Sequence, residues 1–217
     1  MEQRPPNQES NFYDDPAVRR RCCEFLGGDS LSDATAIYLT GVDGDYQRAQ
    51  PMKAASHLAE FLDSDRDIAR SLLDSQSVLV HLDIEYVNFD SAAECFLNPQ
   101  RSFELQQPVI DTIEELLLSF GIRPLHLLTG QGHHFIWRVG RHSDAVARLT
   151  NLIPEGLKSS HVSHNPCAGE IEEAGVQAFA GLGMVIEFLA LQIKFLAAPR
   201  SKIPVEITAV HVGAGAG

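Results

Sequence analysis

Apolar and polar residues alternate along two stretches of the chain, and this alternation predicts two β-strands. Successive side chains of a strand point to opposite faces, so each stretch has an apolar and a more polar face. In residues 78–86 the apolar set is Val78, Val80, Leu82, Ile84 and Tyr86, and the polar set is His81, Asp83 and Glu85. In the second stretch Phe135, Trp137 and Val139 alternate with His134, Ile136 and Arg138. If the aromatic face lies in the core, His134 and Arg138 point outward.

A glycine-rich turn precedes the second strand. Gly130 and Gly132 flank Gln131 between two apolar runs, which is typical of a β-hairpin. We expect glycines here to allow positive φ and a close approach of the backbone to a ligand. His133, next in the chain, is expected to be a turn residue or a hydrogen-bond partner on the Asp83 side, and His126 a packing or edge residue.

Helical spacing of apolar residues predicts the elements around these strands. Short helices are expected over residues 17–26, 91–97 and 144–152, and two helices or one broken helix over residues 51–75. Pro108 is expected to open a strongly amphipathic helix that Gly121 ends, after a loop over residues 98–107.

Three further segments complete the predicted elements. Residues 36–39 and 203–212 are strand candidates, and the second ends in a glycine-rich run. Residues 171–198 are rich in alanine and leucine, which indicates a buried core helix rather than a membrane span because polar residues interrupt it. The polar, proline-containing residues 1–16 are expected to form a mobile tail.

The order strand, helix, strand, hairpin favours an α+β fold of the RRM-like or ferredoxin-like kind. Such a fold has an antiparallel or mixed sheet with helices packed on one face, and we expect additional peripheral helices. At 217 residues, we expect one catalytic domain over residues 17–217. Because residues 203–212 lack a return strand, we expect this domain to be truncated at its C-terminus.

The polar face of the first strand has the chemistry of a metal site. Asp83 and Glu85 stand side by side, and their repulsion is costly unless water, a cation or a basic partner neutralises it. A pair of hard divalent cations would do so. On the second strand, an imidazole at His134 beside the guanidinium of Arg138 suits a phosphate chain.

These motifs together resemble the archaeo-eukaryotic primase superfamily, especially its phage and plasmid members. Its first motif is an apolar strand ending in acid-x-acid, as in Asp83-Ile84-Glu85, and its second is a serine-glycine-x-glycine-x-histidine hairpin. The resemblance implies that Asp83 and Glu85 hold the catalytic metals and that His134 contacts the phosphates of the incoming nucleotide. Thr129 stands where serine is usual. The third motif, a later strand with another acid, is not located; Glu206 is a weak substitute.

The resemblance implies a metal-dependent nucleotidyltransferase of DNA primase or primase-polymerase type, acting in DNA replication or repair. Its cofactor would be Mg²⁺ or Mn²⁺, and its partners nucleoside triphosphates, a single-stranded DNA template and a helicase or another replication protein. The catalytic residues would be Asp83, Glu85 and His134, and the nucleotide-binding residues would be Thr129, Gly130, Gln131, Gly132, His134 and Arg138. Two alternatives stay open: a catalytically incomplete nucleotide-binding or replication-assembly module, and a two-metal phosphoesterase.

Composition and charge bound these interpretations. The net charge of −12 counts against strong autonomous binding of DNA, because an acidic chain gains little from counterion release. His161, His164 and Cys167 have a spacing that could contribute to a zinc site, although no fourth ligand lies nearby. The four cysteines form no C-x-x-C pair, so we expect reduced thiols. The amino terminus lacks the apolar core of a secretion signal, and we expect a cytoplasmic location and no membrane partner.

Overall fold

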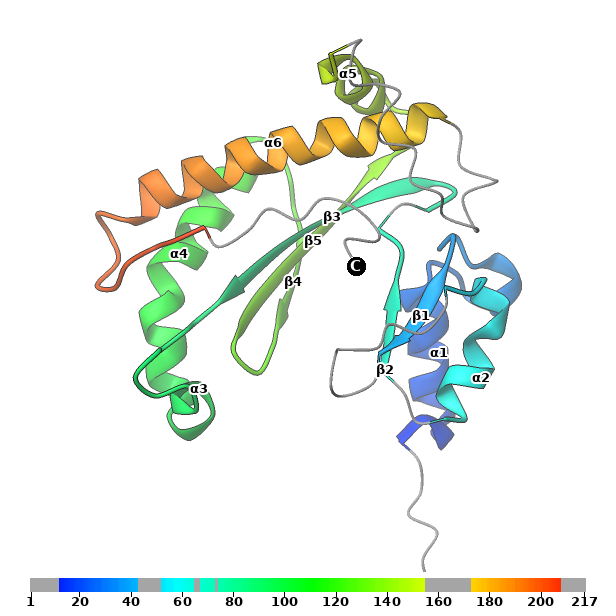
Figure 1. Cartoon of the computed structure of the whole chain (residues 1–217), viewed down its shortest axis with the longest axis horizontal. Coiled ribbons are helices and arrows are strands. Elements are labelled where there is room, and N and C mark those ends of the chain that lie inside the picture. Colours follow the sequence, from blue (N-terminus) through cyan, green and yellow to red (C-terminus); the bar gives the residue numbers. More distant parts are fainter. Residues whose placement is uncertain (1–11, 43–51, 65–66, 73, 155–172, 208–217) are drawn as a thin grey trace, which may run out of the picture. The chain divides into compact units, whose positions relative to one another are not determined.

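The computed structural model describes residues 12–42, 52–64, 67–72, 74–154 and 173–207 (Figure 1). It confirms the predicted α+β class, with two small antiparallel sheets and several helices. The chain divides after Gln76 into two compact units, which are described separately below. A single catalytic domain over residues 17–217 stays a prediction. Of the predicted tail, residues 1–11 lie outside the described residues, and Phe12–Asp14 form a 3₁₀ turn, η1.

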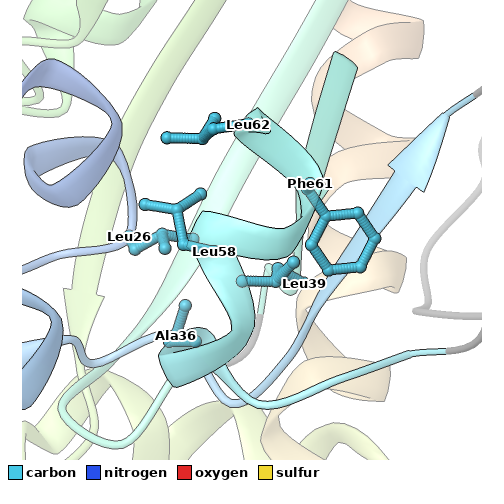
Figure 2. Packing of buried hydrophobic residues seen from close by; sticks show 7 residues of the cluster. Leu26, Ala36, Leu39, Leu58, Phe61 and Leu62 are labelled. Carbon is cyan, nitrogen blue, oxygen red and sulfur yellow. The ribbon is translucent and has the colours of Figure 1, made fainter. Parts of the chain in front are cut away.

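The first unit packs short helices against a two-stranded sheet. Its helices are α1 (Pro16–Phe25) and α2 (Leu58–Leu62), with 3₁₀ turns η2 (Leu31–Asp33) and η3 (Ala55–His57). Its strands are β1 (Leu39–Val42) and β2 (Asp67–Arg70), paired antiparallel. Figure 2 shows the buried cluster that joins these elements: Leu26, Ala36, Leu39, Leu58, Phe61 and Leu62.

Of three sequence predictions for this unit, two need correction and one is confirmed. The predicted helices over residues 51–75 are wrong in their second half, because residues 67–70 form β2. Pairing with β1 satisfies the backbone of this segment, and such tertiary pairing overrides a weak helical spacing. The strand predicted over residues 36–39 begins only at Leu39 and continues to Val42. The helix predicted over residues 17–26 is confirmed within one residue at each end.

The second unit contains a three-stranded sheet that holds the acidic strand and the hairpin. Its strands are β3 (Ser77–Glu85), β4 (Leu125–Leu128) and β5 (Gly132–Gly140). The spatial order is β3-β5-β4, and β5 is antiparallel to both neighbours. The strands β3 and β4 therefore run in the same direction with β5 between them.

Two long helices cover one face of this sheet: α4 (Pro99–Ser119) and α6 (Glu173–Ala197) (Figure 1). Their apolar side chains share a buried cluster with the strands, made of Leu82, Phe135, Ile110, Ile113, Leu117, Leu189 and Ile193. Trp137 and Ile84 are packed against this cluster. The alternation in the sequence therefore identified the core face of both strands.

The helix α4 begins nine residues earlier than predicted. The loop expected over residues 98–107 is wrong from Pro99 onward, since this segment is helical. The Asn98 side chain caps the helix by accepting a hydrogen bond from the Arg101 N–H, and Pro99 suits the first helical position. Pro108 consequently lies inside the helix rather than at its start. Gly121 has φ +73° just after the helix and ends it as predicted. The short helix expected before α4 is α3 (Glu94–Leu97).

The helix α5 (Asp144–Leu152) matches its predicted bounds and packs on α6. Gly181 permits this close approach, since a Cβ there would lie 2.0 Å from the Leu149 carbonyl oxygen. The helix α6 is only partly the expected core helix, because only one of its faces is buried. Its residues 177–197 are long and apolar enough to span a membrane, by length and composition. Residues 203–207 form no strand, and the rest of the strand predicted there lies outside the described residues.

Candidate functional site

The pairing of β3 with β5 places Asp83 opposite His134. The two residues are direct cross-strand partners, so their side chains lie on the same face of the sheet. The His134 Nε2 is 3.1 Å from Asp83 Oδ1, and the two side chains are 30% and 48% exposed. This face is opposite the one covered by α4 and α6, as the sequence predicted for both residues.

His81 forms a third member of this cluster. Its ring meets that of His134 edge-on, with centroids 4.5 Å apart, and its Nε2 is buried without a hydrogen-bond partner. Burial, chiefly, and the neighbouring His134 lower the pKa of His81, against an opposing effect of Asp83. A neutral His81 therefore stands behind the more exposed Asp83 and His134 pair.

Glu85 lies at the end of β3, two residues beyond Asp83 on the same face. Its side chain is exposed and forms no ion pair with other described residues. Nowhere in the described ranges do three or more His, Cys, Asp or Glu side chains form a group that could hold a metal ion. The donor set of Asp83 and Glu85 fits Mg²⁺ or Mn²⁺ only in the manner usual for nucleotide enzymes, where one or two carboxylates are completed by water and phosphate oxygens.

The hairpin turn is closed by Thr129 and Gly132. The Thr129 Oγ1 accepts a hydrogen bond of 2.9 Å from the Gly132 N–H, and the Gly132 carbonyl accepts one of 2.9 Å from the Thr129 N–H. The positive φ expected at Gly130 and Gly132 is not used, since among described glycines only Gly27 and Gly121 have it. Gly132 is required for a different reason: a Cβ there would lie 1.8 Å from the Ile84 carbonyl oxygen.

Gln131, at the tip of the turn, is anchored from behind. Its carbonyl oxygen accepts hydrogen bonds from the Gln106 side chain at 3.3 Å and from the Tyr86 N–H at 3.1 Å. Gln106 is buried on α4, in the segment expected to be a loop, so the sequence analysis missed it. The only available signal was the asparagine-proline pair before that segment, which marks a helix start.

Arg138 shares the outward face of β5 with His134, as predicted, but lies four residues along the strand. At about 3.3 Å per residue, their backbones are separated by about 13 Å. Ile136 lies between them on the same face, and Arg138 itself is exposed. At this spacing the two side chains suit an extended polyanion such as a phosphate chain.

A second histidine pair lies on the opposite face of the sheet. The His133 Nδ1 is 2.8 Å from His126 Nε2, and His126 Nδ1 is 3.4 Å from Glu114 Oε1. The expectation that His133 lies in the turn or on the Asp83 side is wrong: it is the second residue of β5, pairs with Ile84 and is buried on the core face. Burial, and then the charge of His126, lower the pKa of His133. The hydrogen bond between the rings needs one unprotonated nitrogen, so double protonation breaks it.

The lowered pKa values of His81 and His133 predict a pH-dependent stability. The unfolded state binds protons below about pH 6.5, whereas both folded imidazoles resist protonation, so the free energy of unfolding falls as pH drops below about 6.5. Each group contributes at most about 1.4 kcal/mol per pH unit. Urea unfolding between pH 8 and pH 5 measures the slope, which His133→Gln is expected to reduce.

The matched control for this measurement is His142→Gln, since His142 is exposed. It should leave the slope as in the parent chain. An unchanged slope in His133→Gln as well would contradict the assignment of the buried imidazole as a source of acid sensitivity.

Two remaining site predictions are not brought into this cluster. His161, His164 and Cys167 lie outside the described residues, so the zinc interpretation stays a prediction. Glu206, the weak substitute for a third acid, forms an ion pair with Lys194 at the end of α6 instead of joining Asp83.

Comparison with known proteins adds no relative. No protein-family model, no curated protein and no solved structure matches the chain. The geometry of the cluster formed by Asp83, His134, His81 and Glu85 is therefore the basis for any functional conclusion.

Proposed function

We propose that the chain is a metal-dependent nucleotidyltransferase of primase-polymerase type. The observation that supports this proposal best is the 3.1 Å approach of Asp83 and His134 across β3 and β5, on the outward face of the sheet. Glu85 and the tight turn at Gly130 lie at the same end of that face. Carboxylates and an imidazole so arranged suit a nucleotide triphosphate and its metal.

The strand order supports an RRM-like or ferredoxin-like core for this enzyme. In such a core, a strand, a helix and a hairpin are connected so that the last strand inserts between the first two. The order β3-β5-β4, with α4 connecting β3 to β4, follows the same path. This topology brings an acid on the first strand beside a histidine on the hairpin.

In this proposal Asp83 and Glu85 hold Mg²⁺ or Mn²⁺. The bound metal would stabilise charge on the α-phosphate and on the departing pyrophosphate. His134, whose Nε2 lies 3.1 Å from Asp83 Oδ1 and donates to that carboxylate, would turn its Nε2 toward the phosphates once the carboxylate holds the metal. Positioning and electrostatic stabilisation are the main requirements of phosphoryl chemistry, so no side-chain nucleophile is needed.

Apolar residues beside His134 give the same face a surface for a nucleobase. Leu127, on β4, pairs with His134, and Ile136 lies two residues beyond His134 on β5. Leu127 is exposed and Ile136 is half-buried. A base resting on these side chains would leave its triphosphate near His134 and the turn, where the backbone N–H groups of Gly130 and Gln131 would be the donors for phosphate.

Arg138, at the far end of this face, suits a more distant phosphate of the template strand or of the primer. The net charge of −12 makes such binding weak for the chain alone. A helicase or another replication protein is accordingly proposed as the partner that delivers single-stranded DNA.

A nucleotide-binding module without turnover is the second candidate. The absence of a third carboxylate from the cluster, within the described residues, favours it. Both candidates use Asp83 and His134 for binding, and they differ only in whether product forms.

The deciding experiment combines nucleotide incorporation with nucleotide binding. On single-stranded templates, primed or unprimed and with Mn²⁺, incorporation is expected from the parent chain, and His134→Ala should lower its rate about 100-fold by removing a phosphate contact. His142→Ala, an exposed histidine outside the cluster, is the control and should retain full activity.

The outcomes separate the candidates. Metal-dependent nucleotide binding without incorporation supports the module, and cleavage without incorporation supports a phosphoesterase. If neither binding nor incorporation occurs, or if His134→Ala behaves as His142→Ala does, the proposal is contradicted.

A further inference from the structure

The helix α6 has two apolar faces, and the second has no partner among the described residues. Its inner face packs on α4, α5 and the sheet. Its outer face exposes a stripe of large side chains: Met184 (49% exposed), Phe188 (59%), Leu191 (52%) and Phe195 (76%). Val185 and Leu196, on the flank of the helix beside this stripe, are also exposed. Four large apolar residues exposed together on one helix indicate an interaction surface.

The spacing of the stripe is that of a coiled-coil seam. From Met184 the steps are four, three and four residues, which is the alternation of core positions in a heptad. Phe188 and Phe195 occupy one type of core position, and Met184 and Leu191 the other. The 25 residues of α6 make the helix about 37 Å long, which accommodates such a seam.

We infer that this stripe, called the α6 seam below, binds the α6 seam of a second copy of the chain in antiparallel orientation. A two-fold axis that brings Phe188 against Leu191 of the second copy also brings Met184 against Phe195 of the second copy. Each large residue of the stripe then has an apolar partner. The inference goes beyond the proposed function and does not depend on it.

The charges beside the α6 seam select the antiparallel orientation. Glu187 and Lys194 each directly precede a core position, so they lie on the same edge of the seam. Antiparallel pairing brings this edge of one helix against the same edge of the other, and Glu187 meets Lys194 of the second copy twice. Parallel pairing would place Glu187 against Gln192 of the second copy and would form no ion pair.

The side chains needed for these contacts are accessible. Glu187 is exposed and has no ion pair within the part of the chain that the structure describes. Lys194 is paired with Glu206, but both are substantially exposed, and a surface pair of this kind exchanges at little cost.

A lipid bilayer is the main competing occupant, since residues 177–197 are apolar enough to span one. Spanning would remove Leu189 and Ile193 from the buried cluster that they form with Phe135. The chain is also acidic, which opposes binding to an anionic membrane surface. A second copy would bury the exposed outer face of α6 and leave the packing of its inner face unchanged.

The test is the mass of the full chain in solution, measured by sedimentation equilibrium across a range of concentrations. The parent chain is expected to be dimeric, and Phe188→Glu should raise the dissociation constant at least about tenfold because it places a charge in the seam. Leu118→Glu is the matched control: Leu118 is 59% exposed on α4, away from the seam, and its replacement should leave the dimer intact.

A charge exchange tests the orientation. Glu187→Lys alone and Lys194→Glu alone should each weaken the dimer, because each creates two like-charge contacts, and the double variant should restore it. Circular dichroism of every variant checks that the exposed replacements leave the fold unchanged.

A monomeric parent chain, with or without binding to phosphatidylcholine vesicles, overturns the inference. So does a dimer that Phe188→Glu leaves unaffected. Failure of the charge exchange to restore association, in variants that remain folded, overturns the antiparallel pairing.

Discussion

Replacing Asp83 with asparagine is expected to lower metal-dependent nucleotide incorporation by about 1,000-fold. The substitution keeps the shape of the side chain but removes its charge, which the proposed metal needs. The ion pair with His134 is lost as well, yet both partners are partly exposed, so the free energy of unfolding should change by less than about 1 kcal/mol. Incorporation at several Mn²⁺ concentrations, together with urea unfolding, separates the two effects.

The control for this variant is Asp90→Asn, because Asp90 is an exposed carboxylate of the same unit beyond the end of β3. It should match the parent chain in both measurements. If Asp83→Asn kept its Mn²⁺-dependent activity, the carboxylate would be a surface residue and the nucleotidyltransferase proposal would fail.

Replacing Gly132 with alanine is expected to lower the free energy of unfolding by about 3 kcal/mol, the upper end of the usual range for overpacking. The added Cβ would lie 1.8 Å from the Ile84 carbonyl oxygen, which is a backbone atom and cannot rotate away. The strands β3 and β5 must then separate at the end that holds Asp83 and His134, and overpacking typically costs about 1–3 kcal/mol. Urea unfolding measures the loss.

The chain offers a matched control at the other end of the same strand. A Cβ at Gly140 would meet no atom within 4 Å, and Gly140 does not have positive φ. Gly140→Ala should therefore change the free energy of unfolding by less than about 0.5 kcal/mol. Equal stability of the two variants would show that β3 and β5 do not approach as closely at Gly132 as described.

The faces of β3 and β5 could be predicted because one side of this sheet is buried. The two-residue alternation then assigns every side chain, and it placed Asp83, His134 and Arg138 on the outward face before their pairing was known. The helix α5 was predicted with its observed bounds, and in the structure the Ser143 side chain caps its start by accepting a hydrogen bond from the Val146 N–H.

Other features depend on contacts that the sequence does not display. The strand β2 has only four residues and pairs with β1, a contact that its own sequence pattern does not indicate. Arg138 and His134 were predicted to form a joint site because both lie on the outward face. Their separation along the strand did not enter that prediction. The link from Gln106 to Gln131 joins residues from separate elements, and no local signal indicates it.

The central position of β5 has a consequence for dynamics. Its backbone is hydrogen-bonded on both sides, to β3 and to β4, and the partners Asp83 and His134 are about 50 residues apart in sequence. Amide protons in the middle of β5 should therefore exchange with solvent only when the whole sheet opens, rather than by local fraying. Because such long-range contacts form slowly during folding, the candidate site is expected to be among the last parts of the unit to assemble.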